Sequence, residues 1–407
     1  MSDSTHSVYF YHPQMWRHLK DIVKSNSDLA SRTVEKITEF VPTSKTDDIL
    51  FWATRLLAGG SAIDRTGKLN KFNVTYSPIP AVDASFNKTF GQICLETAES
   101  FWKSNSKINI LWSGGIDSTA GALALLETKP ENSVLSIICT EASIVEYPAF
   151  YNIHKDLCRV LTSEQFLSLD ILHSTELVIT GDVGDQLFGG GYGTKVPNAQ
   201  NVYFDKKDAS WTSVFEFDDP FKVFQFEPKQ NPSLTVPWTS AQLDNFVNII
   251  EEHATACPFP VKTLFDMTWW LNFSTKLNYV TSRIPVLIME QCKQDVTRID
   301  LNTRQSFYLN DDFQRWALSN HDIKVSTSLN TFKQPAKDFI FSLNGDADYA
   351  TNKQKESSTP RMLADGWFSK WKMDSNANYA ILGNGQVFNN KNHMSTEILD
   401  NLFRELS

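Results

Sequence analysis

The chain has 407 residues, which is enough for two or three domains, and 41% of them are hydrophobic, which allows a substantial buried core. The formal net charge of -9 gives no electrostatic reason to expect a nucleic-acid partner, because such partners are normally bound by a basic surface. The five cysteines are an odd number and never form a C-x-x-C pair, which argues against structural zinc and a disulfide framework.

Residues 1–88 form a small N-terminal region in this interpretation. Short β-rich pieces occur at 8–11 and 72–76, and the Pro-Ile-Pro sequence at 78–80 separates them from the rest of the chain. We expect a larger second domain at 89–407.

No membrane or export signal is visible in the sequence. The N-terminal residues lack a basic segment followed by an apolar run, and 18 successive uncharged apolar residues occur nowhere. We therefore expect a cytoplasmic protein that does not bind a membrane.

The central part of the chain alternates strand and helix patterns. Short apolar runs predict strands at 108–112, 134–139 and 177–180. Apolar spacing typical of helices occurs at 84–102, 119–127, 147–161, 266–285, 311–320 and 332–343. This order predicts an α/β fold, in which a parallel sheet carries helices on both faces and a helical C-terminal part comes after it. Ligands of such sheets bind beyond the carboxyl ends of the strands.

The first predicted strand ends in a turn that reads Ser-Gly-Gly-Ile-Asp-Ser. Gly114 and Gly115 allow the backbone to approach a polyphosphate, and the N–H groups at the start of the next helix attract anions. Ser113 and Ser118 add hydroxyl groups. Asp117 would repel phosphates unless a cation lay between them, which makes it a candidate Mg²⁺ ligand. The alternative is an ordinary tight turn with an acidic residue in the first helical turn.

This turn resembles the phosphate loop of the ATP pyrophosphatases, or PP-loop enzymes, which include asparagine, GMP and NAD synthetases, argininosuccinate synthetase and tRNA thiolases. The resemblance implies an adenine nucleotide alpha hydrolase-like fold, with ATP as substrate and Mg²⁺ as cofactor. It also implies that the backbone near Ile138, at the end of the second strand, lies against adenine.

The second glycine-rich turn, at 181–192, resembles the asparagine synthetase segment G-E-G-A-D-E-L-F-G-G-Y. Seven positions coincide if one glycine is inserted before the tyrosine. The resemblance implies that Gly181 contacts adenosine and that Asp185 shares the metal and pyrophosphate with Asp117. Asp182 takes the place of an acidic residue thought to deprotonate the attacking nitrogen, although it is one methylene shorter than the family's Glu. Turn chemistry alone could also explain both aspartates.

Weaker resemblances occur elsewhere in the chain. The family's late R-x-K motif, whose lysine stabilises pyrophosphate, is similar to the segment in which Lys355 would be that lysine and Lys353 the arginine. The pair Glu146 and Tyr147 resembles an acidic pair at a helix start. A solvated charged loop is the alternative for Lys355.

Glutamine-dependent asparagine synthetases have a cysteine directly after the initiator methionine, whereas position 2 is Ser here and the first cysteine is Cys94. We therefore expect no functional glutaminase in residues 1–88, and a similarity to β-lactam synthetase and lasso-peptide cyclase. The implied activity joins an adenylated small-molecule or peptide carboxylate to an amine or ammonia. Two alternatives are a PP-loop enzyme that modifies nucleic acids and a nucleotide-binding protein that has lost catalysis.

Overall fold

The computed structural model divides into two compact units. The first comprises residues 1–79, 196–282 and 373–407, and the second comprises 80–195 and 283–372. The residues that the structure describes are 8–11, 64–68, 77–162, 176–189, 208, 210–211, 248, 250–277, 280–281, 304–325, 328, 330–354, 379–382 and 387–389. Within these residues, no helix has the length and apolarity needed to span a bilayer.

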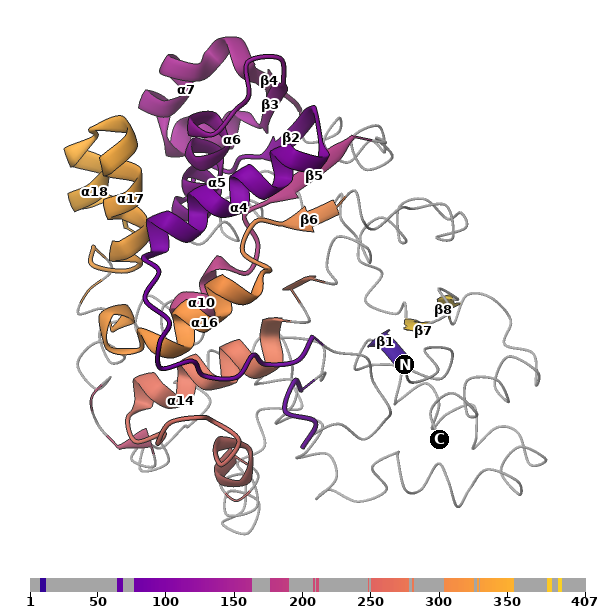
Figure 1. Ribbon diagram of the computed structural model, residues 1–407, viewed down its shortest axis with the longest axis vertical. Coiled ribbons are helices and arrows are strands. Elements are labelled where there is room, and N and C mark those ends of the chain that lie inside the picture. The colour runs from indigo at the N-terminus through magenta and orange to yellow at the C-terminus, as the bar shows by residue number, and fades with distance from the viewer. Residues whose placement is uncertain are drawn as a thin grey trace, which may run out of the picture. The chain divides into compact units, whose positions relative to one another are not determined.

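A five-stranded parallel sheet forms the centre of the second unit (Figure 1). Its strands are β2 (Lys107–Leu111), β3 (Val134–Cys139), β4 (Cys158–Val160), β5 (Leu177–Thr180) and β6 (Arg304–Ser306). The spatial order is β4-β3-β2-β5-β6, and every neighbouring pair is parallel. The predicted α/β character and parallel sheet are confirmed.

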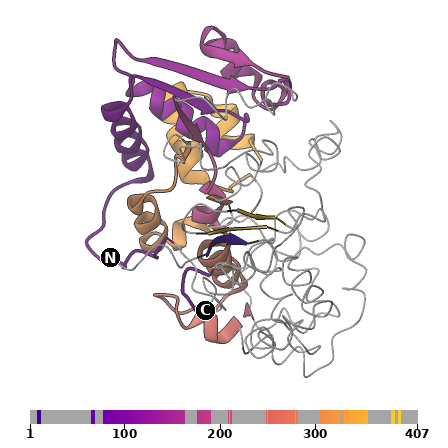
Figure 2. The ribbon, with the colours of Figure 1, turned by 90° about the vertical axis from the view of Figure 1, so that its right-hand side faces the viewer.

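The strand order reverses between β2 and β5. The chain passes from β2 outward to β3 and β4, and then returns to place β5 and β6 on the other side of β2, so that the strands lie side by side (Figure 2). Leu111 and Thr180, the last residues of β2 and β5, are paired with each other. The two glycine-rich turns therefore leave adjacent strands at the same edge, which is where doubly wound sheets bind ligands.

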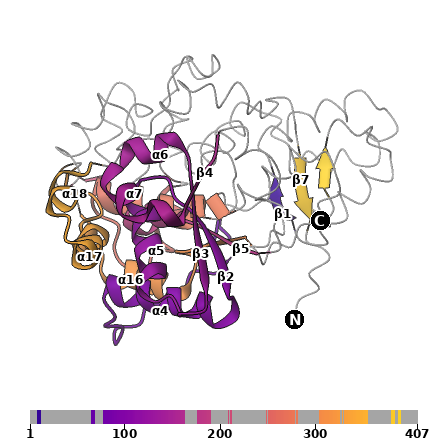
Figure 3. The ribbon, with the colours of Figure 1, turned by 90° about the horizontal axis from the view of Figure 1, so that it is seen from above.

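Three helices gather on one face of the sheet (Figure 3). They are α4 (Phe90–Ser104), α5 (Ile116–Glu127) and α17 (Gln334–Asn344). The small buried residues of α5, among them Ala120 and Ala124, allow close packing against the strands. All four residues of β5 are buried, so this strand is covered on both faces, and the expectation of helices on the second face of the sheet stays a prediction.

The helix predicted at 147–161 is confirmed in its first part and wrong at its end. After α6 (Glu141–Glu146), the chain forms α7 (Pro148–His154), one 3₁₀ turn at 155–157 and then the edge strand β4. Pro148 lacks the N–H that would continue α6 and its ring clashes with the preceding turn, so a new helix begins there. The segment at 158–160 pairs with the edge of β3, which prevails over its helical spacing.

The other predicted helices of the second unit have slightly different ends. The helix predicted at 84–102 begins at Phe90, because the Thr89 side chain accepts a hydrogen bond from the N–H of Gln92 and caps it. The described residues of this unit also form α10 (Gly184–Phe188), α16 (Asp311–Ser319) and α18 (Ala347–Asn352).

The described elements of the first unit include a small sheet and a helix. The antiparallel sheet consists of β1 (Val8–Tyr11), β7 (Tyr379–Leu382) and β8 (Val387–Asn389). Helix α14 (Leu264–Leu271) begins at a Thr263 capping box and continues into a π-helical turn at 272–276.

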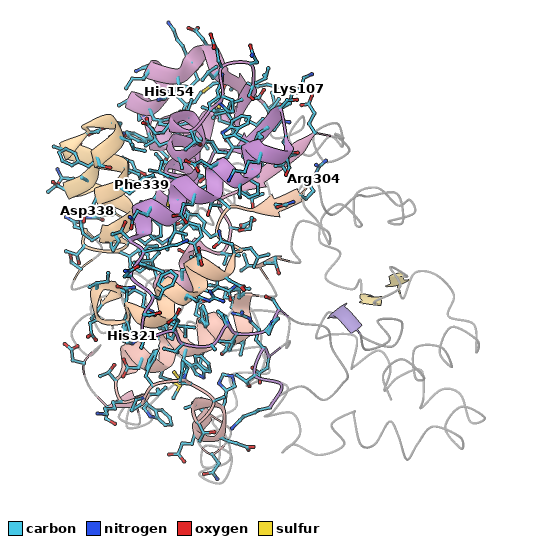
Figure 4. The ribbon with its side chains drawn as sticks, in the orientation of Figure 1. Lys107, His154, Arg304, His321, Asp338 and Phe339 are labelled. Carbon is cyan, nitrogen blue, oxygen red and sulfur yellow. The ribbon has the colours of Figure 1, made fainter. Side chains whose placement is uncertain are left out.

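The amino ends of the strands carry charges of their own (Figure 4). Lys107 at the start of β2 lies 3.6 Å from Glu176, and Arg304 at the start of β6 donates to the Glu176 carbonyl at 3.2 Å. These contacts connect three strands at the edge opposite the glycine-rich turns.

Candidate functional site

The first glycine-rich turn is closed by its two serines. The Ser113 N–H donates to the Ser118 hydroxyl at 3.0 Å, and the two hydroxyl oxygens lie 2.9 Å apart. Gly114 has a φ of 79°, a conformation that favours glycine, and Gly115 is the residue directly before α5. The loop is thus preformed, with the first turn of α5 directly behind it.

The second turn packs directly against the first. A Cβ atom at Gly181 would lie 2.8 Å from the amide nitrogen of Ser118, and one at Gly184 would overlap the carboxylate of Asp117. Glycine is therefore required at 181 and 184 because of close approach between the turns. Asp185 is in the first turn of α10 and shares a cation with Asp117.

That cation is the ammonium group of Lys333, which lies directly before α17. Its Nζ lies 2.6 Å from Oδ1 of Asp185 and also contacts Oδ2 of Asp117. The lysine side chain is 3% exposed, whereas the side chains of Asp117 and Asp185 are 21% and 30% exposed. In this cluster the ammonium group is therefore buried, whereas the two carboxylates remain partly accessible to a ligand.

Charge balance favours the ionised form of this lysine. Burial lowers the pKa of Lys333, but the charges of Asp117 and Asp185 and their hydrogen bonds raise it, and the net result is a pKa above the ordinary value. Lys333 is therefore an ammonium ion at neutral pH.

Backbone strain is concentrated in the same place. Within the described residues, Val183 and Lys333 are the non-glycine residues with positive φ, at 77° and 57°. A β-branched residue such as Val183 rarely adopts this conformation, and strained residues of this kind cluster at functional sites.

Two tyrosines hold the first turn from behind. The Tyr308 hydroxyl donates to the backbone carbonyl of Asp117 at 2.8 Å, and the Tyr349 hydroxyl donates to the carbonyl of Gly114 at 3.4 Å. Tyr308 comes shortly after β6 and Tyr349 lies on α18, so two separate segments fix the position of the loop.

A second ion pair lies beside the glycines. Lys353 Nζ lies 3.0 Å from Oε1 of Glu146, and both side chains are largely buried. The neighbouring Tyr147 stacks on Tyr349 with ring centroids 4.0 Å apart. The structure thus brings together Lys353 and Glu146, which belong to two separate motifs of the sequence.

The carboxylate pair has the composition expected of a small divalent-cation site. Mg²⁺ commonly takes one or two carboxylates and completes its shell with water and substrate phosphates. Asp117 and Asp185 already converge on one cation, and Gly184 leaves room for the Asp117 carboxylate because it has no Cβ. The two residues therefore fit Mg²⁺, although among the described residues no cluster of three or more potential metal ligands occurs.

The remaining predicted residues lie in different surroundings. The backbone carbonyl of Asp182 accepts a hydrogen bond from Ser306 at 2.6 Å, and its side chain is half-buried beside the second turn. Ile138 is buried in β3, and its carbonyl accepts from Trp112 at 2.8 Å. Lys355 lies outside the described residues.

Lys333 is the residue that sequence reasoning missed. Its side chain reaches Asp117 from 216 positions away, and no motif marks it. One local signal is visible: a lysine just before a helix opposes the helix dipole, and such local conflicts often mark functional residues.

Comparison of the sequence with known protein families and with curated proteins finds no match. Function must therefore be inferred from the arrangement of the residues themselves.

Proposed function

We propose that this chain is an ATP-dependent, AMP-forming carbon–nitrogen ligase, which adenylates a substrate carboxylate and transfers the acyl group to an amine or ammonia. The observation that carries this proposal is the convergence of Asp117, Asp185 and Lys333 where two glycine-rich turns leave adjacent parallel strands. A tight backbone cradle, a helix start and a mixed carboxylate–lysine cluster are the parts that binding and cleaving a polyphosphate requires.

The β,γ-pyrophosphate of ATP would lie against the turn of Ser113 and Gly114 and the start of α5, because the first N–H groups of a helix attract anions. Bound to Asp117 and Asp185, Mg²⁺ would neutralise the charge of the pyrophosphate. Lys333 would supply a further positive charge beside the departing group. This is the role that the resemblance to amide-forming ligases gives to a late lysine.

The chemistry proceeds in two displacements in this proposal. A carboxylate oxygen attacks the α-phosphorus, and the bond to the β,γ-pyrophosphate breaks with its electron pair leaving on pyrophosphate. The amine then attacks the acyl carbon and AMP departs with the electrons of the acyl–oxygen bond. Asp182 takes the proton from the nitrogen, and its half-buried position allows a carboxylate to serve as that base.

The test is product analysis with the full chain, ATP and Mg²⁺, across panels of carboxylates and amines. We expect AMP and pyrophosphate, and exchange of labelled pyrophosphate into ATP that depends on the carboxylate. With an [¹⁸O]carboxylate, one label should appear in AMP. ADP as the main product would overturn the proposal, and AMP formation that requires a nucleic acid would favour the nucleic-acid-modifying alternative.

A further inference from the structure

Lys333 stands where two carboxylates need a positive charge. Its Nζ contacts Asp117 and lies 2.6 Å from Asp185, so the three side chains together carry a formal charge of about -1. Without the lysine the two carboxylates would repel each other, and one of them would protonate or turn away.

We infer that Lys333 is a positioning residue that keeps Asp117 and Asp185 converged while no metal ion is bound, and that it competes with Mg²⁺ for them. The inference rests on the proposed function for the identity of the ion. Because the lysine already compensates one negative charge, free Mg²⁺ gains little from the pair. The ion therefore binds together with the nucleotide, whose phosphates supply the missing negative charge.

The surrounding backbone keeps the lysine in this position. Pro335 at the second helical position of α17 fixes the start of the helix, and Lys333 adopts a left-handed φ of 57° directly before it. Lys337, one turn further on, donates to the carbonyl of Asn330 and so holds the approach to the helix. The ion pairs that the Lys333 side chain makes offset the cost of its left-handed backbone conformation.

A merely structural ion pair would behave differently when the lysine is removed. The neighbouring pair of Lys353 and Glu146 provides the matched control, since it is also largely buried and contains one carboxylate. Removing Lys353 leaves a single carboxylate, whereas removing Lys333 leaves two neighbouring carboxylates with no cation between them. A divalent cation should repair the second defect and leave the first unchanged.

The first experiment measures thermal unfolding of the full chain without nucleotide, in EDTA and in millimolar Mg²⁺. The wild-type midpoint should be independent of Mg²⁺. Lys333→Met should unfold at a lower temperature in EDTA and recover most of the loss in Mg²⁺. Lys353→Met should lose stability in both conditions, and adding Asp185→Asn to Lys333→Met should abolish the recovery.

The second experiment measures Mn²⁺ binding by electron paramagnetic resonance, again without nucleotide. Lys333→Met should bind Mn²⁺ roughly tenfold or more tightly than the wild type, because one nearby positive charge is absent. Equal affinity in the two proteins, or a Lys333→Met midpoint that Mg²⁺ does not raise, would overturn the inference.

If Lys333→Met fails to fold, the wild type alone decides. It should bind Mn²⁺ weakly by itself and tightly with α,β-methylene-ATP. A tight Mn²⁺ site that needs no nucleotide and is lost in Asp185→Asn would contradict the inference. Failure of the proposed function has a different signature: no AMP is formed, while the nucleotide-free Mg²⁺ and Mn²⁺ responses are unaffected.

Discussion

The carboxylate–lysine cluster of the second unit and a polar cluster in the first unit are both built from residue types that catalyse reactions. In the first unit, Nε2 of His253 lies 3.1 Å from Oδ1 of Asp64 and 3.3 Å from the Ser274 hydroxyl. These three side chains are essentially inaccessible, at 0 to 1% exposed. Asp117 and Asp185, by contrast, keep 21% and 30% of their side chains exposed.

The geometry of the first-unit cluster also excludes a nucleophilic triad. In such a triad the serine and the aspartate contact different ring nitrogens of the histidine, whereas here Ser274 and Asp64 both face Nε2 of His253. The adjacent Arg65 donates to the backbone carbonyls of Ser77, Pro78 and Phe273. This cluster fastens the turn at 64–67 to the segment after α14. Residue types alone therefore identify only a candidate site. Solvent accessibility, and carboxylates that converge on one point, distinguish a functional site from a cluster that only stabilises the fold.

The largest effect that we expect from this contrast is a loss of enzymatic turnover when the accessible carboxylate–lysine cluster is mutated. Asp117→Asn removes the charge that would face the phosphates in the proposed reaction, while Asp185 keeps its contact with Lys333, so the fold should persist. We expect AMP formation to fall by roughly two to three orders of magnitude, as for other losses of a preorganised charge in an active site. Steady-state assays with saturating ATP measure this. Unchanged turnover in the variant would remove the cluster from consideration as the active site.

The sequence predicted the parts of this site that depend on local patterns. Apolar runs identified β2, β3 and β5, and the glycines after β2 and β5 marked both turns, because a run of buried residues and a tight turn are encoded in neighbouring positions. It missed β4 and β6, which are three residues long and contain polar residues such as Arg159 and Gln305. Strands of that kind are defined by the edge that they join, which the sequence does not show.

Local sequence patterns could not predict the role of Lys333, for a different reason. Lys333 meets Asp117 and Asp185 only after α17 has packed against α5, and its position therefore depends on tertiary structure. The late lysine proposed from a family resemblance, Lys355, lies in a segment whose placement the structure does not describe, so its role stays a prediction.

A smaller effect, on stability alone, is expected in the other cluster. Asp64→Asn replaces a buried carboxylate that accepts hydrogen bonds from the Thr66 N–H at 2.9 Å and from His253. We expect a loss of about 1–3 kcal/mol in the free energy of unfolding, because buried donors lose a charged partner. Urea denaturation measures the loss, and AMP formation by the folded fraction should equal that of the wild type. A proportionate loss of turnover would mean that both clusters serve catalysis, and the distinction drawn from accessibility would fail.

The smallest effect is expected for the residues behind the first glycine-rich turn. Like the buried cluster of Asp64, His253 and Ser274, they should affect stability and not turnover. The Tyr147 hydroxyl donates to Asp346 at 2.8 Å and accepts from Asn344 at 2.9 Å, so Tyr147→Phe should cost about 1 kcal/mol near neutral pH. Burial raises the pKa of Tyr147, and Asp346 raises it further, above the value of about 10 in an unfolded chain.

The sign of the pH dependence is set by this pKa. The folded protein retains the Tyr147 proton where the unfolded chain releases it, so the contribution of the hydroxyl to stability is complete below about pH 10 and is lost as the pH rises further. The difference between wild type and Tyr147→Phe should therefore shrink from about 1 kcal/mol to about zero near pH 11. Urea denaturation of both proteins at several pH values measures it, and every other titrating group is common to the two. If the difference in unfolding free energy between the two proteins is constant with pH, the Tyr147 hydroxyl is already in contact with water. The residues behind the turn would then be as accessible to solvent as Asp117 and Asp185.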